Sequence, residues 1–238
     1  MSCYETIDYE IADHVATVTL NRPKALNAHN VQMRDDMGEV LTAIRDDDDI
    51  RAVVFRGAGE KAFCAGADLS EFLTAPPPTA AREVRFDTGL WELFISIPQP
   101  IVAALHGFVL GSGIEIALCC DIRIAAEDAR FGLPEMGLGM IPAAGGTQTV
   151  PRAAGVGKAL DMILTNRWIS ASEAQKAGLV NRVVTKPQLY PMAYEMAASI
   201  AACDPELVQN AKSIILRGLD MPLSMGLRLE EQAFLGAV

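Results

Sequence analysis

Short apolar runs of strand length alternate with helical stretches over the first 130 residues, and this alternation constrains the fold more than any other feature. Residues 6–20 alternate in the manner of strands, with a break near Ala12 that indicates a hairpin. Buried-strand patterns follow at 51–55, 101–105 and 122–126. Because strands that alternate with helices pack as helical layers on a sheet, the sequence predicts an α/β core.

The first helical stretch is recognised by apolar residues at helical spacing: Met33, Met37, Val40, Leu41 and Ile44. It ends at the acidic run 46–49, which we interpret as a solvated loop. Three prolines at 76–78 mark a surface loop between two helical stretches, the second at about 79–96, and a further helix begins near Ser112. After Gly145 we expect mainly helices, at 147–153, 156–164, 172–177, 187–202 and from Glu206 onward.

The composition is that of a globular chain with an acidic balance. Half of the 238 residues are hydrophobic, and 30 Asp plus Glu against 20 Lys plus Arg give a net charge of −10. An acidic surface does not attract phosphate backbones, so we expect no nucleic-acid partner. The uncharged run 93–114 has transmembrane length, but Pro98, Pro100 and three glycines interrupt it, so we expect no membrane span.

The five cysteines are scattered, and no two of them form a Cys-x-x-Cys pair. This distribution indicates neither a disulfide framework nor a metal site, and it favours the reducing cytoplasm. The N-terminus carries acidic residues instead of a basic stretch followed by an apolar one, so we expect no secretory signal there.

Two glutamates stand alone in long uncharged stretches. Glu115 is the only formally charged residue between positions 97 and 120, and Glu135 is the only one between positions 131 and 151. No neighbouring helical turn offers Glu115 a cation, so we expect it to point into the protein, where a carboxyl group becomes a candidate general acid or base. The alternative is that each glutamate caps a helix or pairs with a distant arginine such as Arg123 or Arg152.

Two glycine-flanked segments, 64–68 and 111–113, each open a predicted helix. Helix N-termini present free N–H groups that can hold an oxyanion, although from spacing alone two ordinary helix starts are favoured. A dinucleotide fingerprint is incomplete because Ile116 occupies the third glycine position. A nucleophile elbow at Ser112 lacks the full Gly-x-Ser-x-Gly pattern, and every histidine precedes it.

At these residues the sequence closely resembles the crotonase family, that is, the enoyl-CoA hydratase and isomerase superfamily. Four motifs occur in the order of the family: Asn-Arg-Pro-Lys-Ala-Leu-Asn-Ala at 21–28, Phe-Cys-Ala-Gly-Ala-Asp-Leu at 63–69, Gly-Ser-Gly-Ile-Glu-Ile-Ala-Leu at 111–118, and Phe-Gly-Leu-Pro-Glu at 131–135 followed by Gly-Gly-Thr-Gln at 145–148. The resemblance covers most of residues 5–215.

The resemblance implies a crotonase-like spiral of ββα units over residues 1–185 and a helical segment over residues 186–238 that builds homotrimers, often paired into hexamers. The implied substrate is an acyl-CoA thioester, with no separate cofactor and no metal. The backbone N–H groups of Ala67 and Ser112 are implied to bind the thioester oxygen. Further implied contacts are Lys24, Ala25 and Leu26 at the adenine and phosphate end of CoA, and Ala65, Asp68 and Leu69 along its path.

Both carboxylates are present, which resembles the hydratases, whereas related isomerases commonly keep only the second. The family pattern implies Glu115 as the base on water and Glu135 as the acid toward Cα. An isomerase, another acyl-CoA lyase and a non-catalytic acyl-CoA-binding protein remain alternatives. The sequence departs from the pattern where Ser112 replaces a usual glycine, and where it ends at Val238 before the terminal helix typical of the family. We therefore expect either that the natural chain is longer or that this protein binds CoA in a different way.

Overall fold

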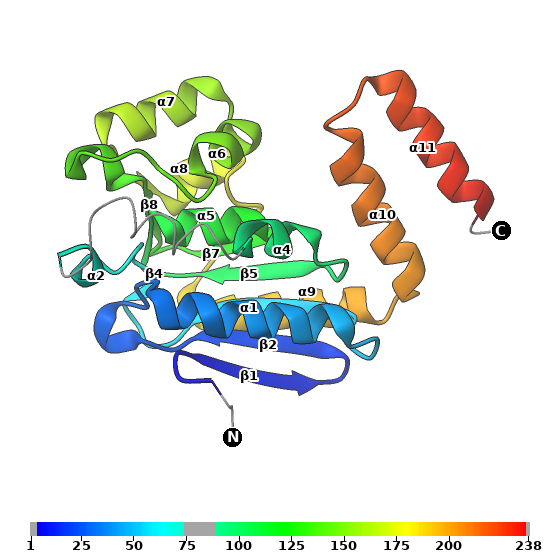
Figure 1. Ribbon diagram of the computed structural model, residues 1–238, viewed down its shortest axis with the longest axis horizontal. Helices are drawn as coiled ribbons and strands as arrows, with labels where there is room; N and C mark the ends of the chain where they lie inside the picture. The colour runs from blue at the N-terminus through cyan, green and yellow to red at the C-terminus, as the bar shows by residue number, and fades with distance from the viewer. Residues whose placement is uncertain (1–3, 74–88, 237–238) are drawn as a thin grey trace.

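Figure 1 shows the computed structural model, which describes residues 4–73 and 89–236. The elements of the N-terminal half are β1 (Ile7–Ala12), β2 (Val15–Leu20), the 3-10 helix η1 (Pro23–Ala25), α1 (Val31–Asp46), β3 (Ala52–Gly57), β4 (Ala62–Cys64), α2 (Ser70–Leu73), α4 (Leu90–Ser96), β5 (Ile101–Leu105), β6 (Phe108–Leu110) and α5 (Ser112–Cys119). Those of the C-terminal half are β7 (Ile122–Ala126), β8 (Arg130–Gly132), the 3-10 helix η2 (Pro134–Leu138), α6 (Gly146–Ala154), α7 (Val156–Thr165), β9 (Ile169–Ser170), α8 (Ala171–Lys176), β10 (Arg182–Val184), α9 (Lys186–Ala201), α10 (Pro205–Gly218) and α11 (Leu223–Gly236).

Successive strands are divided between two sheets. One sheet has the order β1-β2-β3-β5-β7-β10, and the other has the order β4-β6-β8-β9. In each of the pairs β3 and β4, β5 and β6, and β7 and β8, the first strand joins the larger sheet and the second joins the smaller one. Each turn of the chain thus adds one strand to each sheet before a helix follows. The predicted α/β spiral of ββα units is confirmed.

Helices cover both faces of the six-stranded sheet. Alternate residues of β3 point to opposite faces, so that Val53 and Phe55 pack with α1 while Ala52 and Val54 pack with α9. The five apolar residues that predicted α1 are all fully buried. α9 contributes four residues at a spacing of four: Leu189, Ala193, Ala197 and Ala201. Figure 1 shows α1 in front of the sheet, with α9 behind it.

The arrangement of parallel strands explains how distant motifs meet. β4, β6 and β8 are parallel neighbours, so their carboxyl ends share one edge of the smaller sheet. Residues 65–69 follow β4, residues 111–113 follow β6 and η2 follows β8 closely. Three of the four family motifs therefore lie side by side at that edge, which is where open α/β sheets usually bind ligands.

Several expected boundaries differ from the observed ones. The strands β4, β6, β9 and β10, of two or three residues each, are too short to show a period and were not predicted. Pro76 to Pro78 and the first part of the helix expected at 79–96 lie outside the described residues, whereas α4 matches its end. None of the helices in the described ranges is long and apolar enough to cross a membrane.

Candidate active site

Glu115 lies on α5, directly after β6, and its side chain points into the protein as its isolation predicted. The residue is 2% exposed. Its Oε1 accepts hydrogen bonds from the backbone N–H groups of Ala144 and Gly146, each at 2.9 Å, at the start of α6. Burial raises the pKa of Glu115, and these two hydrogen bonds together with one from the Ser112 hydroxyl limit that rise. The carboxyl group is therefore buried but supplied with donors.

Glu135 occupies a different environment on η2. Its Oε2 is buried and has no hydrogen-bond partner within the described part of the chain. Burial raises the pKa of Glu135 to about 7, and the negative charge of Glu115 adds to the rise. The two carboxyl groups thus have different environments. Backbone N–H groups of Ala144 and Gly146 support the charged form of Glu115, whereas only the backbone N–H of Glu135 itself supports the charged form there.

For Glu115, the structure distinguishes capping of a helix from pairing with Arg123 or Arg152. Glu115 does satisfy the N-terminus of α6, as a capping carboxylate would. Neither arginine is its partner, since Arg123 donates to the backbone oxygens of Cys120 and Leu179. Arg152 donates to Gln148 in its own helix. Capping by Glu115 does not exclude a chemical role, because the N–H groups engage only one of its two oxygens.

Close backbone packing places the two glycine-flanked segments against each other. A Cβ added to Gly111 would lie 2.8 Å from Glu135 Oε1 and 3.5 Å from the Cα of Gly66. A Cβ added to Gly113 would lie 2.2 Å from the backbone oxygen of Cys64, so only glycine fits there. The candidate oxyanion residues are the direct neighbours of this contact, and the carboxyl group of Glu135 adjoins it.

The two predicted N–H donors make no hydrogen bond to a backbone acceptor within residues 4–73 and 89–236. Ser112 is the first residue of α5, so its N–H has no partner inside the helix. Ala67 lies in a short parallel bridge with His29, in which the bonds run from His29 N to Gly66 O and from Asp68 N to His29 O. Among the described residues, neither the Ala67 N–H nor the Ser112 N–H donates a backbone hydrogen bond. Both remain available for a ligand.

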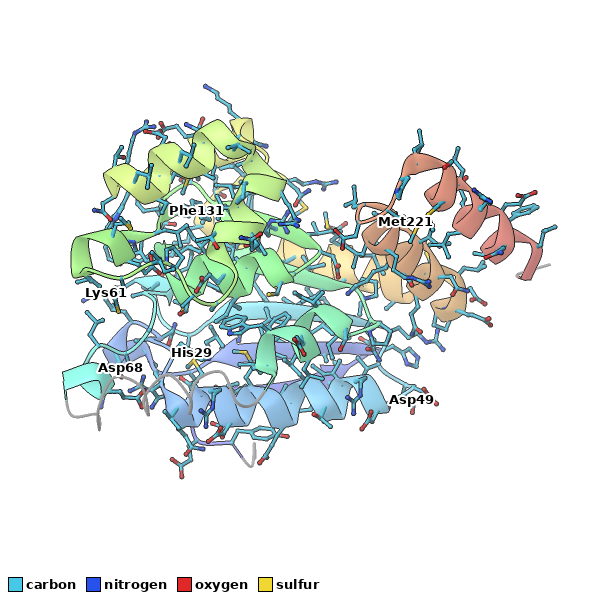
Figure 2. All side chains as sticks on the ribbon, turned by 45° about the horizontal axis from the view of Figure 1, so that its top comes forward. His29, Asp49, Lys61, Asp68, Phe131 and Met221 are labelled. Carbon is cyan, nitrogen blue, oxygen red and sulfur yellow. The ribbon has the colours of Figure 1, made fainter. Side chains whose placement is uncertain are left out.

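Two of the predicted CoA contacts line a common cavity of about 260 Å3. Lys24 and Leu26 line it together with Lys61, which the sequence analysis missed. Lys61 immediately precedes β4, and a lysine two residues before the second motif in an acidic chain was the available signal. In Figure 2 the labelled Lys61, His29 and Asp68 lie at one end of the molecule, whereas Asp49 lies at the opposite end. Two exposed cations at this cavity suit a phosphate-bearing ligand.

The other predicted CoA contacts are not among the residues that line this cavity. Ala25 belongs to η1 between Lys24 and Leu26, and Leu69 is 47% exposed. Ala65 donates its N–H to Leu26 O at 3.1 Å, which joins the first motif to the second. The carboxylate of Asp68 is engaged by Arg22 at 2.8 Å, a partner that sequence reasoning did not assign.

A larger cavity, of about 390 Å3, lies on the α9 side of the six-stranded sheet. Its lining includes Arg56, His106, Lys186 and Tyr190 and none of the predicted site residues. Arg56 stacks on Tyr190, and Lys186 is already paired with acidic side chains. Within residues 4–73 and 89–236, no group of three or more His, Cys, Asp or Glu is placed to hold a metal ion.

Comparison with known proteins agrees with this fold. The model of the enoyl-CoA hydratase/isomerase family matches residues 10–237. The short-chain-enoyl-CoA hydratase of Clostridium acetobutylicum is 42% identical over 220 residues, which are 92% of this chain and 84% of that protein. The (E)-benzylidenesuccinyl-CoA hydratase of Thauera aromatica is 41% identical over 93% of this chain and 86% of its own length.

A crystal structure of an enoyl-CoA hydratase from Bacillus anthracis superposes with a TM-score of 0.93 at 42% identity, covering 98% of this chain and 90% of that one. The crotonase fold implied by the four motifs is thus confirmed. The chain belongs to the enoyl-CoA hydratase/isomerase family, a family of enzymes.

Proposed function

We propose that the protein adds water reversibly across the 2,3 double bond of an enoyl-CoA thioester. One observation carries this proposal: a buried and a partly buried carboxyl group in different hydrogen-bonding environments adjoin two backbone N–H groups that have no backbone acceptor among the described residues. Hydration needs one group that takes a proton from water and one that gives a proton to carbon. Different environments for Glu115 and Glu135 meet that requirement.

In the proposed reaction, water attacks C3 of the enoyl group while Glu115 accepts a proton from that water. The electron pair of the double bond moves toward the thioester, so negative charge develops on its carbonyl oxygen. The N–H groups of Ala67 and Ser112 would stabilise this charge. Glu135 then donates its proton to C2, which completes a 3-hydroxyacyl-CoA. Proton exchange with solvent returns both carboxyl groups to their starting states.

The reaction uses only water and the thioester, so we propose no cofactor beyond the CoA of the substrate itself. Lys24 and Lys61, which line the cavity of about 260 Å3, would contact the phosphates of that CoA.

Four described cysteines are free thiols, which supports a cytoplasmic location.

Two similar relatives are named for different acyl groups. Relatives named for a short-chain substrate and for an aromatic substrate are similar to this chain to nearly the same degree, at 42% and 41% identity. The Ser112 side chain places a hydroxyl group, absent from glycine, beside Glu115 at the proposed carbonyl site. A panel of short, long, aromatic and alicyclic 2-enoyl-CoAs would identify the preferred group.

Crotonyl-CoA and a matched 3-enoyl-CoA separate the rival functions. A hydratase converts the 2-enoyl thioester to the 3-hydroxy product, which is followed by loss of absorbance of the conjugated double bond. Formation of a 2-enoyl product from the 3-enoyl thioester, without hydration, would instead support an isomerase. Acyl-CoA binding without turnover of any member of the panel would support a non-catalytic binding protein.

We also propose that α10 and α11 form an interface between copies of the chain. In Figure 1 these helices pair with each other and extend away from the sheets. Lys212 attaches α10 to the core through Asp121 at 2.7 Å and Gln99 O at 3.0 Å. Large apolar residues on the pair are 41–80% exposed: Leu207, Ile215, Leu216, Leu219, Leu223, Met225, Leu227, Phe234 and Leu235. Such a surface is typical of a protein–protein contact.

Sedimentation should therefore give a homotrimer or a homohexamer at micromolar concentration. Replacement of Leu219 and Leu223 by Ser is expected to shift the protein toward the monomer, because both side chains are at least 77% exposed in the single chain and contribute little to its own core. As a control, Glu195 on α9 is exposed and charged, and its replacement by Gln should leave the assembly unchanged. A parent protein that sediments only as a monomer of about 25.5 kDa would contradict the proposed interface.

A further inference from the structure

Arg22 joins two segments that are distant in the sequence. It lies between β2 and η1, and its guanidinium group has two acceptors. One terminal nitrogen donates to Asp68 Oδ2 at 2.8 Å, and the other donates to Ala28 O at 2.5 Å. The side chains of Arg22 and Asp68 are only 23% and 15% exposed. The planar fork of arginine suits this double contact, which a lysine ammonium group reproduces only in part.

The contacts of Arg22 converge on the segment that carries Ala67. Asp68 uses its second oxygen, Oδ1, to accept from Ser70 Oγ at 2.6 Å. Its backbone N–H donates to His29 O at 3.0 Å, and His29 N donates to Gly66 O at 2.8 Å. Ala67 is thus held between two backbone bonds to His29, the residue after Ala28. Arg22 therefore contacts both segments of this bridge, through Ala28 O on one segment and the Asp68 carboxylate on the other.

The turn that carries Arg22 is itself held firmly. Asn27 is completely buried, and its side chain accepts from Arg22 N at 2.9 Å. The same side chain donates to the backbone oxygens of Ala58 and Ala62, each at 2.9 Å. Leu26 and Asn27 both have φ near +55°, which is uncommon outside glycine. Because the backbone of this turn is fixed, the position of Arg22 relative to Asp68 is fixed as well.

We propose that Arg22 is a positioning residue that orients the Ala67 N–H through its ion pair with Asp68. This inference rests on the proposed function. It differs from a role of Asp68 as a contact along the CoA path, because the carboxylate serves Arg22 and Ser70 instead of a ligand. A positioning role affects the transition state more than it affects CoA binding, so kcat should change more than KM.

The test uses Arg22→Met, Asp68→Asn, the double variant and a more conservative Arg22→Lys. We expect each of the first two to lower kcat on the best enoyl-CoA by about 10-fold to 100-fold, because small misplacement of a catalytic group carries losses of this order. The dissociation constant of free CoA should stay within about two-fold, since binding does not depend on the oxyanion donor. The double variant should be no slower than the slower single variant, because both changes break one interaction. Arg22→Lys should retain part of the rate.

A second readout does not depend on turnover. Hydrogen exchange of the backbone amides at 65–69 should become faster in Arg22→Met, because the bond from Asp68 N to His29 O loses its support. Arg45→Met is the matched control, since Arg45 pairs with Asp46 at the exposed far end of α1 and should alter neither kcat nor this exchange. Melting temperatures identify any variant that fails to fold.

Each contrary outcome has a distinct meaning. Unchanged kcat and unchanged exchange in Arg22→Met would overturn the positioning role. A raised KM and weaker CoA binding at unchanged kcat in Asp68→Asn would show that Asp68 contacts CoA. Multiplying losses in the double variant would show that the residues act separately. If the parent turns over no enoyl-CoA, the proposed function fails, and the exchange measurement alone decides whether Arg22 orders the Ala67 segment.

Discussion

Replacement of Glu115 or Glu135 by Gln is expected to lower kcat by at least about 100-fold while the protein stays folded, because general acid–base groups commonly contribute about 10²–10⁴. Glutamine preserves the shape of the side chain and, at position 115, an oxygen that can still accept from Ala144 and Gly146. It cannot exchange a proton at working pH. Steady-state rates on crotonyl-CoA or the best thioester of the panel measure the loss, with exposed Glu195→Gln as the control. Turnover within a few-fold of the parent would remove the role from that glutamate.

The same variants make a pH prediction whose sign follows from the pKa of Glu135. Burial raises this pKa to about 7, so the group keeps the proton it must donate at lower pH and loses it above that value. In the hydration direction, kcat/KM should therefore fall as the pH rises through about 7. This alkaline decline should be absent from the residual activity of Glu135→Gln. A decline that persists unchanged in that variant would have to come from another group.

Replacement of Ala67 by Pro is expected to lower kcat by about 10² to 10³, or ~2.7 to 4 kcal/mol in the barrier, because it deletes one of the two N–H groups proposed to stabilise the oxyanion. The structure makes this substitution unusually informative. The Ala67 N–H donates no backbone hydrogen bond among the described residues, so its removal breaks none of those contacts. The preceding residue is Gly66, whose backbone freedom limits the strain that proline imposes.

Ala67→Gly is the matched control, since it retains the N–H and removes only a methyl group. Its kcat should stay close to that of the parent, while CoA affinity and melting temperature should be similar in both variants. Near-parental turnover by a folded proline variant would falsify the assignment of Ala67. A large loss in the glycine variant would point to the methyl group or to backbone mobility instead of the N–H.

Much of this protein could be predicted from local pattern. The spacing of Met33, Met37 and Val40 predicted α1, and an uncharged run around Glu115 predicted its burial. These inferences hold because a helical period and the hydration of a charge are decided by neighbouring residues. The four motifs also identified the family, since each is a dense set of residues within one short segment.

The site itself depends on contacts that no local pattern contains. The bonds from Ala144 and Gly146 to Glu115 span 29 and 31 positions, and the ion pair from Arg22 to Asp68 spans 46. Strands of three residues are too short to show a period, yet β4, β6 and β8 bring three motifs to one edge because they pair in parallel. The sequence by itself therefore determined the helices, the longer strands, the burial of Glu115 and the family. Only the tertiary structure decided which N–H groups lack a backbone acceptor among the described residues and which glutamate has a pKa raised to about 7, because both depend on burial and distance between segments far apart in the chain.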